Sequence, residues 1–152
     1  SMTTLTINGT EYKIKYGYEA TARCGVVEKV DELQKVLAKS EDLKVEDLNK
    51  ILHILPELLL AGLQKFHKDE FGYDYETEDG KLAALNKAYG LVDDYFDADD
   101  SDITVLFNLL TNEMVNNGFL AQLLRKGAEV EAAQKSKTAK KASTRTAKKA
   151  TA

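Results

Sequence analysis

The sequence predicts a mostly helical α+β domain: an N-terminal β-hairpin packed on about four α-helices, followed by a disordered basic C-terminal tail. Three observations lead to this prediction. A segment of alternating polarity near the N-terminus contains Asn8-Gly9, which is typical of a hairpin turn. Apolar segments with helical spacing follow it. From Gln134 onward there is no large apolar residue. We therefore expect one domain over residues 3–130 and a flexible, low-complexity tail over residues 131–152.

The hairpin prediction specifies a register. With Asn8-Gly9 as a two-residue type I′ turn, Leu5 faces Tyr12 and Thr3 faces Ile14. One face of the hairpin is then apolar, and it must pack on helices because a lone hairpin is marginal in water. The free strand edges offer a route to self-association. The candidate self-association residues are Leu5, Ile7, Tyr12 and Ile14.

The most apolar segment, Leu48–Phe66, predicts the helix around which the core forms. Most of its large apolar residues fall within an arc of about 140° on a helical wheel. Ile54 and Leu60 lie on either side of that arc, which suggests burial in the core or against a partner. Pro56 cannot donate a hydrogen bond to the carbonyl four residues earlier, so we expect a kink or a short break there.

Three further helical segments are expected around this one. The first covers residues 19–39 and is weakened by Gly25. The second begins at a cap on Thr77 or Asp79, after an irregular loop over residues 67–76, and ends near Phe96. Its predicted inner face consists of Leu82, Leu85, Tyr89, Val92 and Phe96.

The third segment begins at a cap on Asp100 or Ser101 and ends before a break at residues 116–118. Its apolar stripe consists of Ile103, Leu106, Leu110 and Met114, with Phe107 beside it. A short apolar patch follows the break and either folds back or serves as a contact. This patch consists of Phe119, Leu120, Leu123 and Leu124.

The sequence lacks the motifs of catalysis and metal binding. It contains no phosphate-binding loop, dinucleotide fingerprint, zinc-protease helix or paired-cysteine site. Cys24, the single cysteine, fits a small buried residue in a reducing compartment. Six aspartates lie within residues 93–102, but the calcium-loop pattern that begins at Asp97 has Asp102 at its glycine position and Asn108 at its glutamate position. We expect a solvated acidic turn or a docking patch for a basic partner, and no enzyme, metal or cofactor.

The charge is distributed unevenly along the chain. Residues 1–134 carry 14 Lys and Arg against 25 Asp and Glu, whereas residues 135–152 carry seven bases and no acid. The tail repeats Thr-Ala-Lys-Lys-Ala, from Thr138 and again from Thr146. Such a segment either solubilises the chain or contacts nucleic acid through phosphates. Because the body would repel phosphate, we expect no contact with nucleic acid except through residues 135–152.

Residues 4–18 read Thr-Leu-Thr-Ile-Asn-Gly-Thr-Glu-Tyr-Lys-Ile-Lys-Tyr-Gly-Tyr. This segment resembles the N-terminal signature of the tail assembly chaperones of long-tailed bacteriophages. The signature is a short strand, a two-residue turn, an aromatic and basic second strand that ends in an aromatic-Gly-aromatic step, and a helix. Leu58–Leu63 looks like the apolar helix of that family, which a polar loop and two more helices follow. The resemblance covers roughly residues 3–126.

The resemblance implies a non-enzymatic role. Such chaperones act in the bacterial cytoplasm, hold the tape measure protein soluble while the major tail protein polymerises around it, and leave before the virion is complete. The family often makes a longer frameshifted form that meets the major tail protein, so this chain would be the short form. We expect a homo-oligomer with no membrane contact. Candidate partner-binding residues are Ile54, Leu60, Phe119, Leu120, Leu123 and Leu124.

Two other functions remain open from the sequence. The first is a nucleic-acid-associated protein that acts through its basic tail. The second is a structural tail-completion or connector protein, which would persist in purified virions, whereas a chaperone would not.

Overall fold

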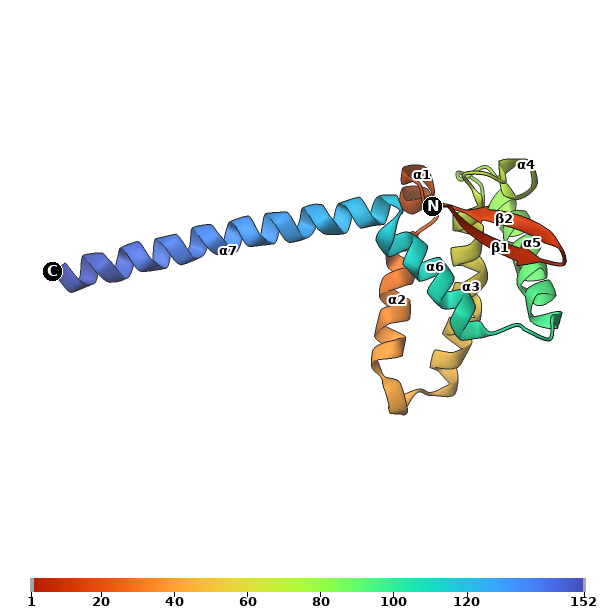
Figure 1. The fold of residues 1–152 in the computed structure, drawn as a ribbon, viewed down its shortest axis with the longest axis horizontal. Helices are drawn as coiled ribbons and strands as arrows, with labels where there is room; N and C mark the ends of the chain where they lie inside the picture. Colours follow the sequence, from red (N-terminus) through yellow and green to blue (C-terminus); the bar gives the residue numbers. More distant parts are fainter. Residues whose placement is uncertain (1, 152) are drawn as a thin grey trace. The chain divides into compact units, whose positions relative to one another are not determined.

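A computed structural model describes residues 2–151, with the side chains described for residues 2–135. The chain is mostly helical and begins with a two-stranded antiparallel hairpin (Figure 1), which confirms the predicted fold class. It divides into two compact units, Ser1–Leu120 and Ala121–Ala152, and each is described by itself. The first unit ends ten residues before the domain boundary expected from the sequence. The predicted tail from residue 136 onward lies outside the residues whose side chains are described.

The hairpin has the register that the turn chemistry predicts. Strand β1 (Thr3–Ile7) pairs with β2 (Thr10–Ile14), with Leu5 opposite Tyr12 and Thr3 opposite Ile14. Asn8 and Gly9 have φ values of 51° and 76°, the positive angles that a type I′ turn requires at both central positions. The apolar face of the hairpin is buried in the core.

The first predicted helix is in fact two helices. Helix α1 (Tyr18–Arg23) has Cys24 as its C-cap, and α2 (Val26–Ala38) begins after Gly25, whose φ is 66°. Glycine adopts this left-handed conformation without the steric cost that a Cβ atom imposes, so the chain turns between the two helices. A short 3₁₀ turn, η1 (Ser40–Asp42), then leads toward α3.

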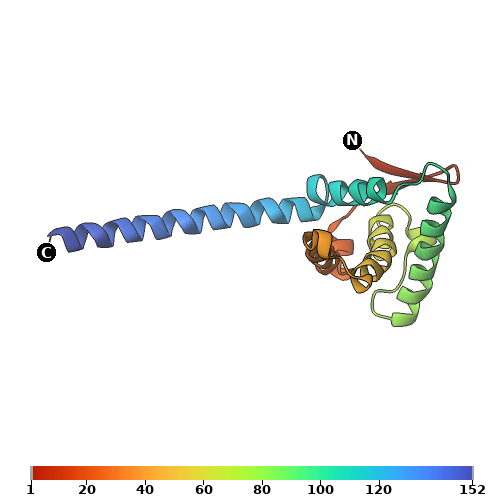
Figure 2. The same cartoon turned by 90° about the horizontal axis from the view of Figure 1, so that it is seen from below.

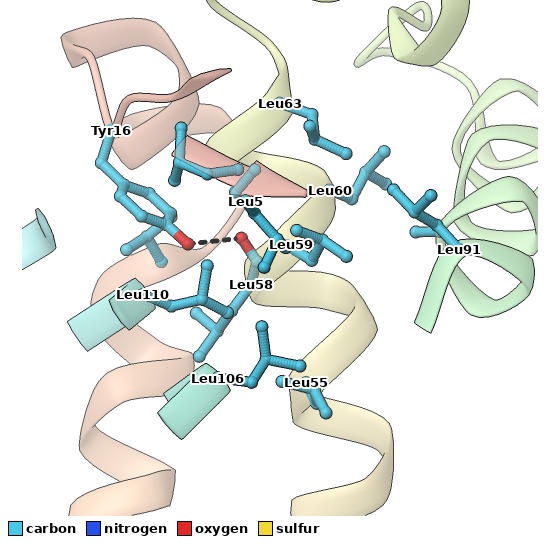
Figure 3. Close-up of a cluster of buried hydrophobic side chains, with 14 of the residues drawn as sticks. Leu5, Tyr16, Leu55, Leu58, Leu59, Leu60, Leu63, Leu91, Leu106 and Leu110 are labelled. Atoms are coloured by element: carbon cyan, nitrogen blue, oxygen red, sulfur yellow. Dashed lines mark hydrogen bonds between the residues drawn. The ribbon is translucent and has the colours of Figure 1, made fainter. Parts of the chain in front are cut away.

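Helix α3 (Val45–Leu63) is the centre of the fold and continues through Pro56 without a break. It lies between α2 and α5, and the hairpin crosses its C-terminal half (Figures 1 and 2). Every residue from Ile54 to Leu63 is buried except Glu57. The core around this half of α3 includes Leu5, Leu91, Leu106 and Leu110 (Figure 3). Leu120 of α7 belongs to the same cluster.

Close backbone approach joins the hairpin to α3. Lys15 N–H donates a hydrogen bond to the Gly62 carbonyl at 3.0 Å, and the Tyr16 hydroxyl donates to the Leu58 carbonyl at 2.8 Å (Figure 3). A Cβ atom on Gly62 would lie 2.9 Å from Ile14 Cγ2 and 3.0 Å from the Tyr16 ring. The absence of a side chain at Gly62 therefore lets the hairpin sit against the helix.

Helices α4 (Lys68–Phe71) and α5 (Glu78–Asp97) follow α3, so the loop expected after α3 contains one helical turn. Thr77 caps α5 as predicted, because its hydroxyl accepts a hydrogen bond from Gly80 N–H. The predicted inner face of α5 is wrong at its ends, since Leu82 and Phe96 are exposed. The buried positions are Ala84, Ala88 and Leu91. Small alanine side chains let α5 pack closely on the core, whereas the expectation from the sequence favoured the larger residues.

Helix α6 (Ile103–Asn116) has Asp102 as its N-cap. The Asp102 carboxylate accepts hydrogen bonds from Thr104 and Val105 N–H at 2.8 and 3.2 Å. The cap is therefore neither Asp100 nor Ser101, because only Asp102 sits directly before the first helical turn. The predicted break follows at Asn117-Gly118, and α7 (Phe119–Thr151) begins after it.

Candidate functional site

An apolar groove lies between α2, α3 and α6 in the first unit. Its volume is ≈ 400 Å³, and seven of its nine lining residues are apolar. We call it the α2–α3–α6 groove. Its lining consists of Leu33, Leu37, Leu48, Ile51, Leu52, Ile103, Thr104, Phe107 and Asn108.

Three pairs of apolar residues, each four positions apart, build the groove. They are Leu33 and Leu37 on α2, Leu48 and Leu52 on α3, and Ile103 and Phe107 on α6. Residues spaced by four lie on one face of a helix, so each helix presents one pair to the same hollow. The groove therefore follows from ordinary helical spacing on three neighbouring helices.

The rim of the groove is open to solvent. The exposed fractions are 56% for Leu37, 51% for Leu48 and 60% for Leu52, and Ile103 is exposed as well. Leu33 is buried and forms the floor. Single exposed leucines are common on protein surfaces, but a contiguous set around a hollow is typical of a binding surface.

Two ion pairs hold α2 against α3 beside the groove. Lys39 Nζ lies 2.8 Å from Asp47 Oδ1, and Asp47 Oδ2 accepts a hydrogen bond from Lys44 N–H at 3.0 Å. Near the other end of α2, Lys29 Nζ lies 2.8 Å from Glu57. The hydrogen bond from Lys39 lowers the pKa of Asp47, and the hydrogen bond with Glu57 raises the pKa of Lys29. Both shifts favour the charged pairs that fix the spacing of the two helices.

An acidic turn leads into the α6 wall of the groove. Helix α5 ends at Asp97, and Asp99 and Asp100 are exposed shortly before Ile103. Carboxylate oxygens of Asp93, Asp94 and Asp97, near the end of α5, lie within 4.8 Å of one another, and Asp93 and Asp97 are exposed. Three of the six aspartates therefore belong to α5 and Asp102 caps α6, so the expected acidic turn is limited to Asp99 and Asp100, which place negative charge beside an apolar surface.

The structure corrects two of the candidate partner-binding residues. Ile54 and Leu60 are buried inside the first unit, where they belong to its main apolar cluster. The apolar surface on the C-terminal half of α3 is wide because this half is buried against other elements of the unit, so Ile54 and Leu60 present no free face to a partner. Neither side chain can contact a client without opening the core.

The candidate patch after the break divides in two. Leu120 is buried in the core, and Phe119 is half-buried with its ring 5.0 Å from that of Tyr18 in an edge-to-face contact. Leu123 and Leu124 are exposed on α7. Phe119 and Leu120 therefore anchor the start of α7, and only the two later leucines are available to a partner.

The candidate self-association residues are also unavailable. Leu5, Ile7, Tyr12 and Ile14 are all buried in the core. The outer edge of β2 is covered too, because Lys13 N–H donates a hydrogen bond to His67 Nε2 at 2.9 Å, beside the bond from Lys15 N–H to α3. The apolar face that the alternation identified serves folding instead of association.

The sequence did not single out the groove. Leu48, Ile51 and Leu52 lie within the same apolar arc of α3 as the buried Leu55 and Leu59, so periodicity treats them alike. The difference is tertiary, because the hairpin covers only the C-terminal half of α3. The one local signal is the recurrence of apolar pairs four residues apart near the ends of three helices.

No model of a known protein family, no curated protein and no solved structure matches this chain. Among the described residues, no helix combines the length and the apolar character needed to cross a membrane. Among the residues with described side chains, the α2–α3–α6 groove is the apolar surface on which we base a function.

Proposed function

We propose that this protein is a non-enzymatic tail assembly chaperone of a long-tailed bacteriophage or prophage. In this proposal it binds the tape measure protein, keeps it soluble and helps recruit the major tail protein during assembly of the tail tube. The observation that carries the proposal is the α2–α3–α6 groove, an open apolar surface on a folded unit.

The groove suits a helical client. Amphipathic helices bind other proteins by laying an apolar face into a hydrophobic groove, with anchors at positions i, i+3, i+4 and i+7. The tape measure proteins of such phages are long and helical, and they expose apolar faces until the tube surrounds them. A shallow groove with an open rim gives modest affinity per copy, and many copies along one client add avidity without preventing release.

The remaining partners and the location follow the resemblance. The major tail protein would be met mainly through a longer frameshifted form of the chain. The site of action would be the cytoplasm of the host bacterium, and the protein would be absent from the mature virion. A structural tail-completion or connector protein would instead remain in purified virions. The protein composition of the virion therefore distinguishes a chaperone from a structural component.

The second candidate function is association with nucleic acid through residues 135–152. The charge of that segment favours it, with seven bases and no acid. Removal of residues 135–152 should abolish retention of DNA if this function is correct. The same truncation should leave the solubility of the tape measure protein unchanged if the chaperone function is correct.

The test of the chaperone function is co-expression with the tape measure protein, comparing the wild-type chain with two variants. Leu48→Asp with Leu52→Asp places charge on the groove. Leu82→Asp is the matched control, because Leu82 is 58% exposed on α5 outside the groove. Each buried leucine contributes about 1.5–3 kcal/mol, so the double variant should weaken client binding by about a hundredfold or more.

We expect the tape measure protein to be soluble and to co-purify with the wild-type chain and with the control variant, and to be insoluble with the groove variant. Circular dichroism of the purified groove variant checks that it is folded. A folded groove variant that still solubilises the client would overturn the proposal, as would a client that stays insoluble with the wild-type chain.

A further inference from the structure

Helix α7 carries its own exposed apolar stripe. Over the residues with described side chains, Leu123, Leu124 and Val130 are 49%, 52% and 53% exposed. On a helical wheel these three residues and Gly127 fall within an arc of about 120°, and the charged Arg125 and Glu129 lie outside it. The stripe is the kind of surface that a hydrophobic groove accepts.

We propose that the α2–α3–α6 groove of one copy binds α7 of a second copy, with Leu123 and Leu124 seated among the groove leucines. The inference shares its groove with the proposed function, but it does not depend on the identity of the client.

Charge complementarity supports this occupant. Asp99 and Asp100 are exposed just before the α6 wall of the groove. Arg125 and Lys126 follow directly after the two exposed leucines of α7, and seven further bases begin at Lys135. Glu129 and Glu131 are the acidic groups of α7, and they lie between these two basic stretches. Residues 1–120 carry 12 Lys and Arg against 23 Asp and Glu, whereas residues 121–152 carry nine against two, and opposite net charges favour the encounter of a first unit with α7.

Chain connectivity favours a second copy over the same copy. An α-helix rises about 1.5 Å per residue, so Phe107 lies about 14 Å along α6 from the end of that helix at Asn116. Leu123 lies only about 6 Å along α7 from its start at Phe119, and Leu120 is held in the core. In a chain that reversed at Asn117-Gly118, Leu123 would fall opposite the last turns of α6 and only Val130 would come level with Phe107, so the two leucines of the stripe would miss the groove. A second molecule has no such constraint.

The contact has a definite symmetry. It joins a groove to a helix, so it is heterologous, and every pairing leaves one groove and one α7 free. Copies therefore add head to tail into an open chain or a closed ring. Association also covers the exposed leucines of both surfaces, and a client that uses the groove must displace α7 of the neighbouring copy.

The test measures the molar mass of the full chain by light scattering across a range of concentrations. The α7 variant is Leu123→Asp with Leu124→Asp, the groove variant is Leu48→Asp with Leu52→Asp, and the control is Leu82→Asp. We expect the wild-type chain and the control to form oligomers that grow with concentration. Each double variant alone should be monomeric.

The decisive sample is the equimolar mixture of the two double variants. The α7 variant still has an intact groove, and the groove variant still has an intact α7, so the mixture should form a one-to-one dimer that does not grow further. A mixture that stays monomeric would overturn the proposal, as would a wild-type chain that is monomeric at every concentration. An α7 variant that still forms oligomers would overturn it too.

The outcomes separate this inference from the proposed function. The α7 variant should keep client binding, because its groove is intact. If the groove variant loses self-association but still solubilises the tape measure protein, the proposed function fails and this inference stands. If the groove variant does not fold, Leu52→Gln serves in its place, with the same one-to-one dimer expected on mixing with the α7 variant.

Discussion

Tyr16 shows how a single residue connects three parts of the first unit. Its ring is fully buried, its hydroxyl donates to the Leu58 carbonyl of α3, and its own carbonyl accepts from Phe119 N–H at the start of α7. Gly118 allows this last contact, because a Cβ atom there would lie 2.9 Å from the Tyr16 carbonyl oxygen. The second aromatic of the Tyr-Gly-Tyr step, Tyr18, packs on Phe119. The step is therefore a junction between the hairpin, α3 and α7.

The buried hydroxyl of Tyr16 leads to a prediction about stability. Tyr16→Phe removes the donor to Leu58 and should lower the free energy of unfolding by about 1 kcal/mol. Tyr16→Ala also leaves a cavity and should lower it by about 3–5 kcal/mol. Urea denaturation followed by circular dichroism measures both changes. An unchanged midpoint for Tyr16→Phe would mean that the hydrogen bond contributes nothing net.

The same residue contributes to the alkaline pH dependence of stability. Burial, and then the Glu113 carboxylate, raise the pKa of Tyr16 well above its usual value. A raised pKa in the folded state gives stability that is present in full below the unfolded pKa near 10 and declines above it. The wild-type chain should therefore lose about 1.4 kcal/mol more per pH unit above pH 10 than Tyr16→Phe does.

Among the elements, the hairpin was the most predictable from the sequence. Its register depends on local turn chemistry at Asn8-Gly9, and the structure has the predicted pairing throughout. The break at Gly25 was underestimated, because a glycine only weakens a helix in a propensity argument, whereas here its φ of 66° ends one helix and begins another. Local sequence chemistry thus predicts turns reliably, but it predicts less reliably where one helix ends and the next begins.

The groove could not be predicted in the same way. Leu52 and Leu55 both lie on the apolar side of α3, yet the first is exposed and the second is buried. What separates them is the position of the hairpin and α5 against the helix, and no periodicity carries that information. For the same reason Ile54 and Leu60 were proposed for a partner although the core encloses them.

The contact between the hairpin and α3 gives a prediction at the scale of elements. Gly62→Ala improves the helix propensity of α3 by about 1 kcal/mol, but its methyl group meets Ile14 and Tyr16 at 2.9–3.0 Å. Overpacking of this kind costs about 1–3 kcal/mol, so we expect a net loss of stability.

Gly90→Ala in α5 is the control for Gly62→Ala, because nothing lies within 4 Å of a Cβ atom at that position. This variant should be more stable than the wild-type chain by about 0.5–1 kcal/mol. Thermal unfolding of the two variants should therefore shift in opposite directions. A rise in the thermal midpoint of both variants would show that the hairpin moves to accommodate a methyl group at Gly62 at little cost in stability.

For the whole molecule, the arrangement of charge and apolar surface suggests that the first unit and α7 have different roles. The first unit buries its hairpin face and the C-terminal half of α3, and its described residues leave an apolar groove with acidic residues beside it. Helix α7 carries exposed leucines followed by bases. In the proposed chaperone, each groove binds either α7 of a neighbouring copy or the client, so self-associated copies release α7 as their grooves bind along one long helical client.

The most direct test that the groove binds the tape measure protein is photo-crosslinking from a groove residue during co-expression. A photoreactive phenylalanine analogue would replace Leu52 in one variant and Leu82 in another, each co-expressed with the tape measure protein and then irradiated. We expect a covalent adduct with the tape measure protein from position 52 and none from position 82. A tape measure protein that is soluble and bound but gives no adduct from position 52 would contradict binding in the groove.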